Sequence, residues 1–169
     1  MKRYFCIFLI LMMLFPILGC RSNDFENPLT FYYLRKDDNF GSDDSVIASE
    51  VIDGSKYTQL QIVLAAYFHG PQDPALTSPF PSGVYLLNAQ VHDDFVVVTL
   101  SREFATLTGV SLSLASCALA KTIMDFTGAE AVQIQTLATP LDGEASITIH
   151  ESDILLFDSF TVDATDVTE

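Results

Sequence analysis

The hydrophobic positions between residues 29 and 149 change their spacing several times, and each change predicts a new secondary-structure element. Runs that alternate, or that are rich in β-branched and aromatic residues, predict strands because such side chains fit a pleated, half-buried surface. The strands predicted in this way are 29–34, 46–52, 84–91, 95–100, 132–137 and 147–149. Asp142 and Gly143 mark a turn before the last of them.

Two of these strands predict an antiparallel hairpin, because a short polar turn with Asp93 and Asp94 separates 84–91 from 95–100. Alternation places every second side chain on the same face of a strand. The side chains expected on the buried face are Leu87, Ala89 and Val91 in the first strand and Val96, Val98 and Leu100 in the second.

Helical spacing of the apolar residues occurs twice. The first helix begins near Thr58 and Gln61, whose spacing is that of a capping box. Gly70 and Pro71 end it, since Gly accepts a left-handed cap and Pro cannot continue the hydrogen-bond ladder. The apolar faces comprise Leu60, Val63, Leu64, Tyr67 and Phe68 in the first helix, and Leu112, Leu119, Ile123 and Phe126 in a second helix at 111–126 that Gly128 caps.

The chain between the first helix and the hairpin contains too many prolines for regular structure, so we predict an ordered loop from Pro71 to Gly83. The elements then follow in the order strand, helix, hairpin, helix, strand. This order predicts an α+β domain in which two helices pack on one face of a small, mostly antiparallel sheet.

The N-terminal segment has the organisation of a secretory signal and not of a structural element. Lys2 and Arg3 precede an apolar run from Tyr4 to Leu18, which is shorter than the roughly 20 residues that a spanning helix needs. The run Ile17, Leu18, Gly19 and Cys20 looks like a bacterial lipobox, in which the cysteine receives a diacylglyceryl group and becomes the first residue of the mature protein. Two acyl chains anchor a protein durably, since each buried methylene adds about 0.8 kcal/mol. The alternative is an uncleaved transmembrane anchor.

Cleavage of the signal peptide at 1–19 would leave 150 residues, the usual size of one domain. We predict a lipidated cysteine and linker at 20–28, a folded domain at 29–158 and an acidic tail at 159–169. The mature chain would contain 6 basic and 22 acidic residues, which changes the net charge from −14 to −16. Phosphate backbones repel such a chain, so nucleic acid is not expected as a partner.

Cleavage also leaves Cys117 as the one cysteine that lipid does not block, so no internal disulfide is possible. Its alanine- and leucine-rich surroundings predict a small buried core residue on a helix. His69, His92 and His150 have no metal-ligand spacing and are expected to face solvent. We therefore expect no cofactor.

One acidic loop is a candidate calcium site, because hard cations bind carboxylate oxygens. Asp37, Asn39 and Asp43 lie around Gly41, but Gly41 falls one place early for an EF-hand and Ala48 occupies the position of the closing Glu. The order of ligands therefore fails, and we expect no calcium site.

Several motifs resemble the GerMN domain of sporulation and spore-germination lipoproteins, and together they cover 57–149. They are the helix that ends at Gly70 and Pro71 with the later Leu76, Ser78, Pro79, Phe80, Pro81 and Gly83; the run Val98, Thr99, Leu100, Ser101, Glu103 and Phe104; and Gly109 with Ser111 before a helix that leads to Phe126, Val132 and Gln133. The departures from the family pattern are Thr99 for Asp, Val110 for the second Gly, and Thr127 with Gly128 for a Pro-containing turn.

The resemblance implies an α+β fold similar to the ring-building motifs of secretion-system proteins, a non-enzymatic role, and a spore-forming or related Gram-positive host. It favours an interaction module tethered to the membrane through Cys20, on the extracytoplasmic face. Its partner would be another envelope protein or a second copy of the chain, bound through a sheet edge or through a candidate loop comprising Gly70, Pro71, Ser78, Pro79, Phe80, Pro81 and Gly83.

A second hypothesis belongs to another class: a hydrolase or ligand-binding protein that acts on cell-wall material. Asp93, Asp94 and Glu103 are the carboxylates available for acid and base roles, which need a cleft that drives two pKa values apart. A cleft holding two acids near Glu103 would favour this hypothesis, and a surface without one would favour the interaction module.

Overall fold

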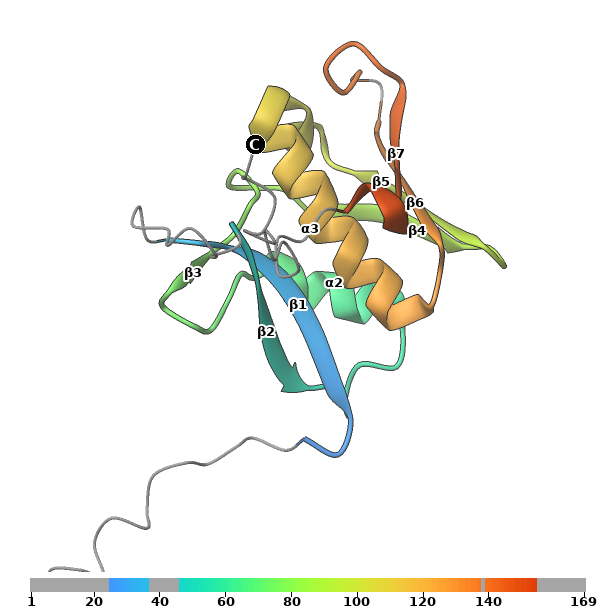
Figure 1. The fold of residues 1–169 in the computed structure, drawn as a ribbon. Coiled ribbons are helices and arrows are strands. Elements are labelled where there is room, and N and C mark those ends of the chain that lie inside the picture. The colour runs from blue at the N-terminus through green and yellow to red at the C-terminus, as the bar shows by residue number, and fades with distance from the viewer. Residues whose placement is uncertain (1–24, 37–45, 138, 155–169) are drawn as a thin grey trace, which may run out of the picture.

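The computed structural model describes residues 25–36, 46–137 and 139–154, which form two α-helices and two β-sheets (Figure 1). The predicted signal peptide, the lipobox cysteine Cys20, the 37–45 part of the acidic loop and the acidic tail lie outside these residues. The elements are β1 (Pro28–Arg35), β2 (Ile47–Asp53), α2 (Leu60–Phe68), β3 (Leu76–Thr77), β4 (Leu86–Val91), β5 (Phe95–Leu100), η2 (Arg102–Thr106), α3 (Gly109–Thr127), β6 (Ala131–Thr136), β7 (Ser146–His150) and η3 (Glu151–Asp153). The predicted α+β class is confirmed.

The strands divide into two sheets where a single small sheet was expected. One sheet has the order β2-β1-β3 with antiparallel pairs, and the other has the order β4-β5-β6-β7. In the second sheet β5 and β6 run parallel, while β4-β5 and β6-β7 are antiparallel. The division follows from β1, which pairs with β2 and β3 on its two edges and therefore has no free edge for the hairpin.

Helix α3 is packed against both sheets through β1 and β6 and forms the centre of the core. Its buried residues are Leu112, Ala115, Ser116, Ala118, Leu119, Ala120, Thr122, Ile123 and Met124. Because it meets a sheet on two sides, it is apolar enough to cross a membrane by length and composition, but half of the relevant window is buried within the protein. The predicted cap is confirmed: Gly128 ends α3 at a left-handed φ of 74°.

Helix α2 has the predicted apolar face, with Leu60, Val63, Leu64 and Tyr67 buried, but the predicted capping box is wrong. The N-cap is Gln59, and no side chain caps the first turn. The Gln61 side chain instead donates a hydrogen bond from Nε2 to the Ala89 carbonyl oxygen of β4, at 3.5 Å. The Gln61 side chain therefore bonds to a distant strand and not, as the sequence pattern predicted, to the start of its own helix.

The hairpin of β4 and β5 is confirmed, but the predicted buried face holds for only one of its strands. Val96, Val98 and Leu100 of β5 are fully buried. On β4 only Ala89 is buried, and the expectation for Leu87 and Val91 is wrong because their side chains are 45% and 58% exposed. A bulge shifts the register between Leu86 and Asn88, and β4 lies at the edge of its sheet.

Candidate interaction surface

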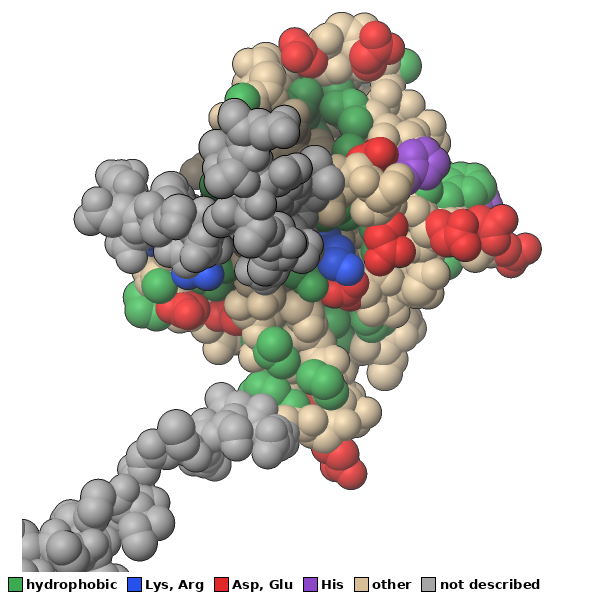
Figure 2. Space-filling view, in the orientation of Figure 1, with side chains coloured by type: hydrophobic (Ala, Val, Ile, Leu, Met, Phe, Trp, Pro, Cys, Tyr) green, Lys and Arg blue, Asp and Glu red, His purple; other side chains and the backbone are tan. Residues whose placement is uncertain are grey.

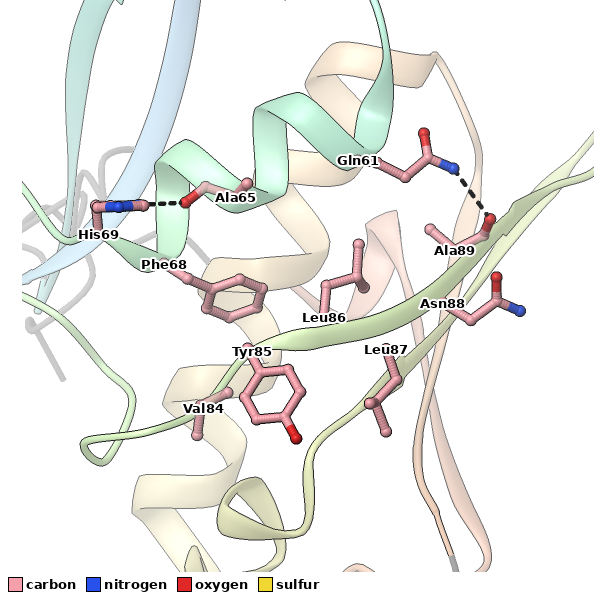
Figure 3. A pocket seen from close by; sticks show the side chains of 10 residues that line it. All are labelled: Gln61, Ala65, Phe68, His69, Val84, Tyr85, Leu86, Leu87, Asn88 and Ala89. Carbon is pink, nitrogen blue, oxygen red and sulfur yellow. Dashed lines mark hydrogen bonds between the residues drawn. The ribbon is translucent and has the colours of Figure 1, made fainter.

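A groove of about 490 Å³ lies between α2 and the edge strand β4 (Figure 3). Helix α2 contributes Gln61, Ala65 and Phe68, and His69 follows at its C-cap. The chain from Val84 to Ala89 contributes the other wall. No Asp, Glu, Lys or Arg lines this groove. In a chain with a net charge of −14, an uncharged concave surface is a distinct feature.

Two polar side chains of the groove contact backbone carbonyl oxygens within it. The Gln61 amide reaches across from α2 to the carbonyl of Ala89 on β4, and a ring nitrogen of His69 lies 2.6 Å from the Ala65 carbonyl oxygen (Figure 3). Phe68 points toward the groove from the last turn of α2. The walls are therefore apolar, with amide groups at the rim.

Large apolar side chains are exposed around this groove and along the hairpin. Tyr85 is 55% exposed and Phe95 is 40% exposed, in addition to Leu87 and Val91. The His92 ring stacks on Phe95 with centroids 4.4 Å apart. Figure 2 shows hydrophobic side chains next to acidic ones and a histidine at the projecting tip of the hairpin. Exposed apolar residues that gather along one hairpin are typical of a surface that meets a partner.

Sequence reasoning missed this groove, although one signal for it was present. Leu86 and Leu87 are consecutive apolar residues and break the alternation of the strand. The break corresponds to the bulge, which leaves Leu87 without a partner position on β5. The contribution of α2 carried no comparable signal, because it depends on which strand the helix covers.

The two ends of the hairpin carry different charges. Asp93 and Asp94 lie exposed at its tip, where the Asp94 carbonyl accepts a 3.0 Å hydrogen bond from the Glu130 amide. At the other end Arg102 pairs with Glu103 at 3.3 Å. The predicted acid and base candidates are therefore at opposite ends of the hairpin.

The Glu103 carboxylate lacks the environment of a general acid. Its pKa is lowered, first by its own backbone amide and then by the Ser101 hydroxyl and Arg102, whereas a general acid needs a raised pKa. Glu103 does not line the groove between α2 and β4. A separate cavity of about 370 Å³ is lined by Asp94 and Glu130 together with His150, at the far end from Glu103.

The proline loop is fixed to the core by an aromatic cluster. The centroid of the Phe80 ring lies 5.0 Å from the ring centroid of Phe68, 5.4 Å from that of Tyr67 and 6.1 Å from that of Phe104. Pro79 is buried, so these two members of the predicted interaction loop pack inward. The other members are placed as follows: Gly70, Pro71, Ser78 and Pro81 are half-buried, and Gly83 is exposed just before β4.

A carboxylate of the first sheet also fixes this loop. Glu50 of β2 accepts hydrogen bonds from the backbone amides of Gln72 and Asp73, at 2.9 and 2.7 Å. Much of the loop is therefore held against the core and the first sheet. Its exposed end at Gly83 leads directly into the groove at β4.

The other reactive residues do not converge on a site in the described residues. His69, His92 and His150 are exposed, and no group of three His, Cys, Asp or Glu side chains that could hold a metal is found in these ranges. Cys117 is half-buried, less than the core position predicted for it. Burial, followed by the charge of Asp153, raises the pKa of its thiol, which disfavours the nucleophilic thiolate.

The arrangement of two helices against two sheets is that of a GerMN-type α+β domain. The tandem GerMN domains of the sporulation protein GerM from Bacillus subtilis match with a TM-score of 0.50 and 18% identity, over 71% of this chain and 43% of that chain. The first GerMN domain of the same protein matches with a TM-score of 0.50 and 10% identity, over 69% of this chain and 91% of that one.

The sequence defines the family directly. Residues 30–141 match the family model Germane, described as sporulation and spore germination, and the chain belongs to this family. The chain spans less than half of the tandem-domain structure and most of the single-domain one. No curated protein matches it.

Proposed function

We propose that the protein is a lipid-anchored interaction module on the extracytoplasmic face of the cell membrane, without enzymatic activity, in an assembly of sporulation or germination. Membership of the sporulation and spore germination family supports the setting. The observation that carries the proposal is the uncharged, apolar groove on an edge strand of a strongly acidic chain. Such a surface gains from contact with another protein, and no carboxylate lines it to work with His69 as an acid and base pair.

The lipobox at Cys20 supports the anchor. Strand β1 begins at Pro28, so the linker 20–28 spans at most about 30 Å when fully extended. The domain would therefore stay close to the membrane surface. Its partner would be another envelope protein within this distance, or a second copy of the chain.

The anchor is tested by Cys20→Ala in the native host, with Cys117→Ala as the matched control. Fractionation should find the Cys20→Ala protein released from the membrane or mislocalised, with an unchanged domain fold, while the Cys117→Ala protein stays in the membrane fraction. If the Cys20→Ala protein remained in the membrane fraction, the segment before it would be a plain anchor and the lipobox interpretation would be wrong.

The interaction role is tested by crosslinking the full chain in its native envelope. We expect a specific crosslinked protein, and no release of fragments when the purified protein is incubated with peptidoglycan. Cleavage of peptidoglycan with no crosslinked protein would overturn the proposal in favour of the hydrolase hypothesis.

A further inference from the structure

We propose that the groove between α2 and β4 binds an extended segment of a partner protein as an added strand. The segment is uncharged and apolar along β4 and carries a lysine or arginine beside the acidic hairpin tip. This inference rests on the proposed interaction function and adds the surface and the chemistry of the partner. It is a case of β-strand addition, in which backbone hydrogen bonds supply affinity and side-chain pockets supply specificity.

Among the sheet edges of the described residues, strand β4 is the least protected against pairing. Proteins protect edges with charged residues, prolines or very short strands. Edge strand β2 contains Glu50 and Asp53, and β3 has only two residues. The six residues of β4 include neither a charge nor a proline.

The fourth edge, β7, is also uncharged, but it exposes no large apolar side chain. Ile147 and Ile149 of β7 pack against the core. On β4, by contrast, Leu87 and Val91 are exposed, and Tyr85 is exposed just before the strand. An added strand would therefore bury apolar surface at β4 and little at β7.

One backbone acceptor of β4 already points into the groove. The Ala89 carbonyl oxygen faces α2 and is contacted by Gln61 Nε2 at 3.5 Å, the long limit of a hydrogen bond. An incoming backbone amide would make a shorter bond at the same oxygen. The Gln61 side chain holds this acceptor in the free protein and would be displaced when the partner binds.

The position of α2 favours a single strand over a second copy of the whole domain. If β4 paired antiparallel with β4 of a second copy, the two α2 helices would lie on the same face of the joined sheet. Neighbouring strands are about 4.8 Å apart, whereas packed helices need about 8–10 Å between their axes. Because α2 packs against β4, the two helices would collide.

Charge determines which end of the bound segment is basic. Asp93 and Asp94 are exposed at the hairpin tip, and Glu130 is adjacent to them. These carboxylates lie beyond the C-terminal end of β4, outside the uncharged groove. A lysine or arginine next to the apolar stretch would meet them, in agreement with the net charge of −14.

The test uses photo-crosslinking of the full chain in its native envelope. A photoreactive residue replaces Tyr85 at the groove or, as a matched control, Val110, which is 75% exposed at the start of α3. We expect the groove position to crosslink to one protein, and mass spectrometry to place the crosslink in an uncharged stretch next to a lysine or arginine. The control position should not give this product.

Two variants in the Tyr85 background sharpen the test. Leu87→Glu places a charge in the apolar contact and should lower the yield about tenfold. Asp93→Lys combined with Asp94→Lys should lower it about threefold, as expected for exposed charge pairs. Val110→Glu is the control and should leave the yield unchanged. Thermal melts of each purified variant establish that it is folded.

The outcomes separate this inference from the proposed function. A specific protein crosslinked at Val110 but not at the groove would overturn the inference and leave the interaction role intact. A crosslink from the groove to a second copy of the chain, or a yield that Leu87→Glu does not change, would also overturn it. Crosslinks to peptidoglycan alone would overturn both.

Discussion

Strands β4 and β5 belong to one hairpin and have similar apolar sequences, yet their side chains have different environments. In β5 the alternate residues Val96, Val98 and Leu100 are fully buried. In β4 the register partner of Val96 is Val91, which is 58% exposed. Paired residues point to the same face of a sheet, so Val91 and Val96 share a face. They differ only in whether other elements cover them. Alternation therefore identifies the face of a strand, but the position of the strand in the sheet determines burial.

The largest effect should come from placing a charge on the buried face of β5, compared with the same charge on β4. Val98→Asp puts an unpaired carboxylate in the core. We expect it to unfold the protein, because the cost approaches or exceeds the free energy of unfolding of a typical domain, about 5–15 kcal/mol. Val91→Asp should leave the protein folded, with a change below about 1 kcal/mol. Circular dichroism and thermal melts measure both. Equal damage from the two variants would mean that β4 is covered in solution.

A second comparison uses two aromatic residues, one at each surface. Phe80→Ala removes a ring that contacts Tyr67, Phe68 and Phe104, and should cost about 2–4 kcal/mol. Tyr85→Ala at the groove should cost less than about 1 kcal/mol, because the side chain is 55% exposed. Denaturant unfolding measures both values. If the order were reversed, the proline loop would not be fixed by its aromatic cluster.

The buried aromatic cluster should also make stability sensitive to alkali. Burial, followed by the charge of Glu50, raises the pKa of Tyr33, and burial raises that of Tyr67. When the pKa of a tyrosine is higher in the folded state, its contribution to stability is fully present below the pKa of the unfolded state, which is about 10. Above that value stability falls by up to about 1.4 kcal/mol per pH unit for each such group.

Unfolding measured between pH 8 and pH 12 checks this expectation. Tyr33→Phe should flatten the alkaline limb, with a small loss at neutral pH because the Tyr33 hydroxyl donates a 3.0 Å hydrogen bond to the Tyr67 carbonyl. The exposed-edge variant Tyr85→Phe is the control. A limb that Tyr33→Phe leaves unchanged would assign the sensitivity to other groups.

The smallest effect should come from a mild change at the edge. Leu87→Thr keeps a strand-forming residue and removes apolar surface that is already 45% exposed. Its stability should stay within about 0.5 kcal/mol of the parent. The crosslinking yield at the groove should nevertheless fall, because the partner loses an apolar contact. A loss of stability greater than that of Phe80→Ala would show that Leu87 belongs to the core.

The sequence alone predicts most of the elements, because each carries a local signal. The helical period identified the buried residues of α2, and Gly128 marked the end of α3. The missed details all depend on distant partners. Gln61 bonds to Ala89 and not to the helix start, and no pattern within the proline loop indicated that Phe80 packs against Tyr67, Phe68 and Phe104.

The sequence by itself determined the α+β class, the hairpin, the acidic character and the family resemblance, because periodicity, turn residues and charge are local properties. The tertiary structure decided that the strands form two sheets around α3, that β4 is an edge, and that α2 and β4 enclose an uncharged groove. These features depend on which elements become neighbours in space. No stretch of the chain contains that information on its own, since it arises from the packing of all elements against one core.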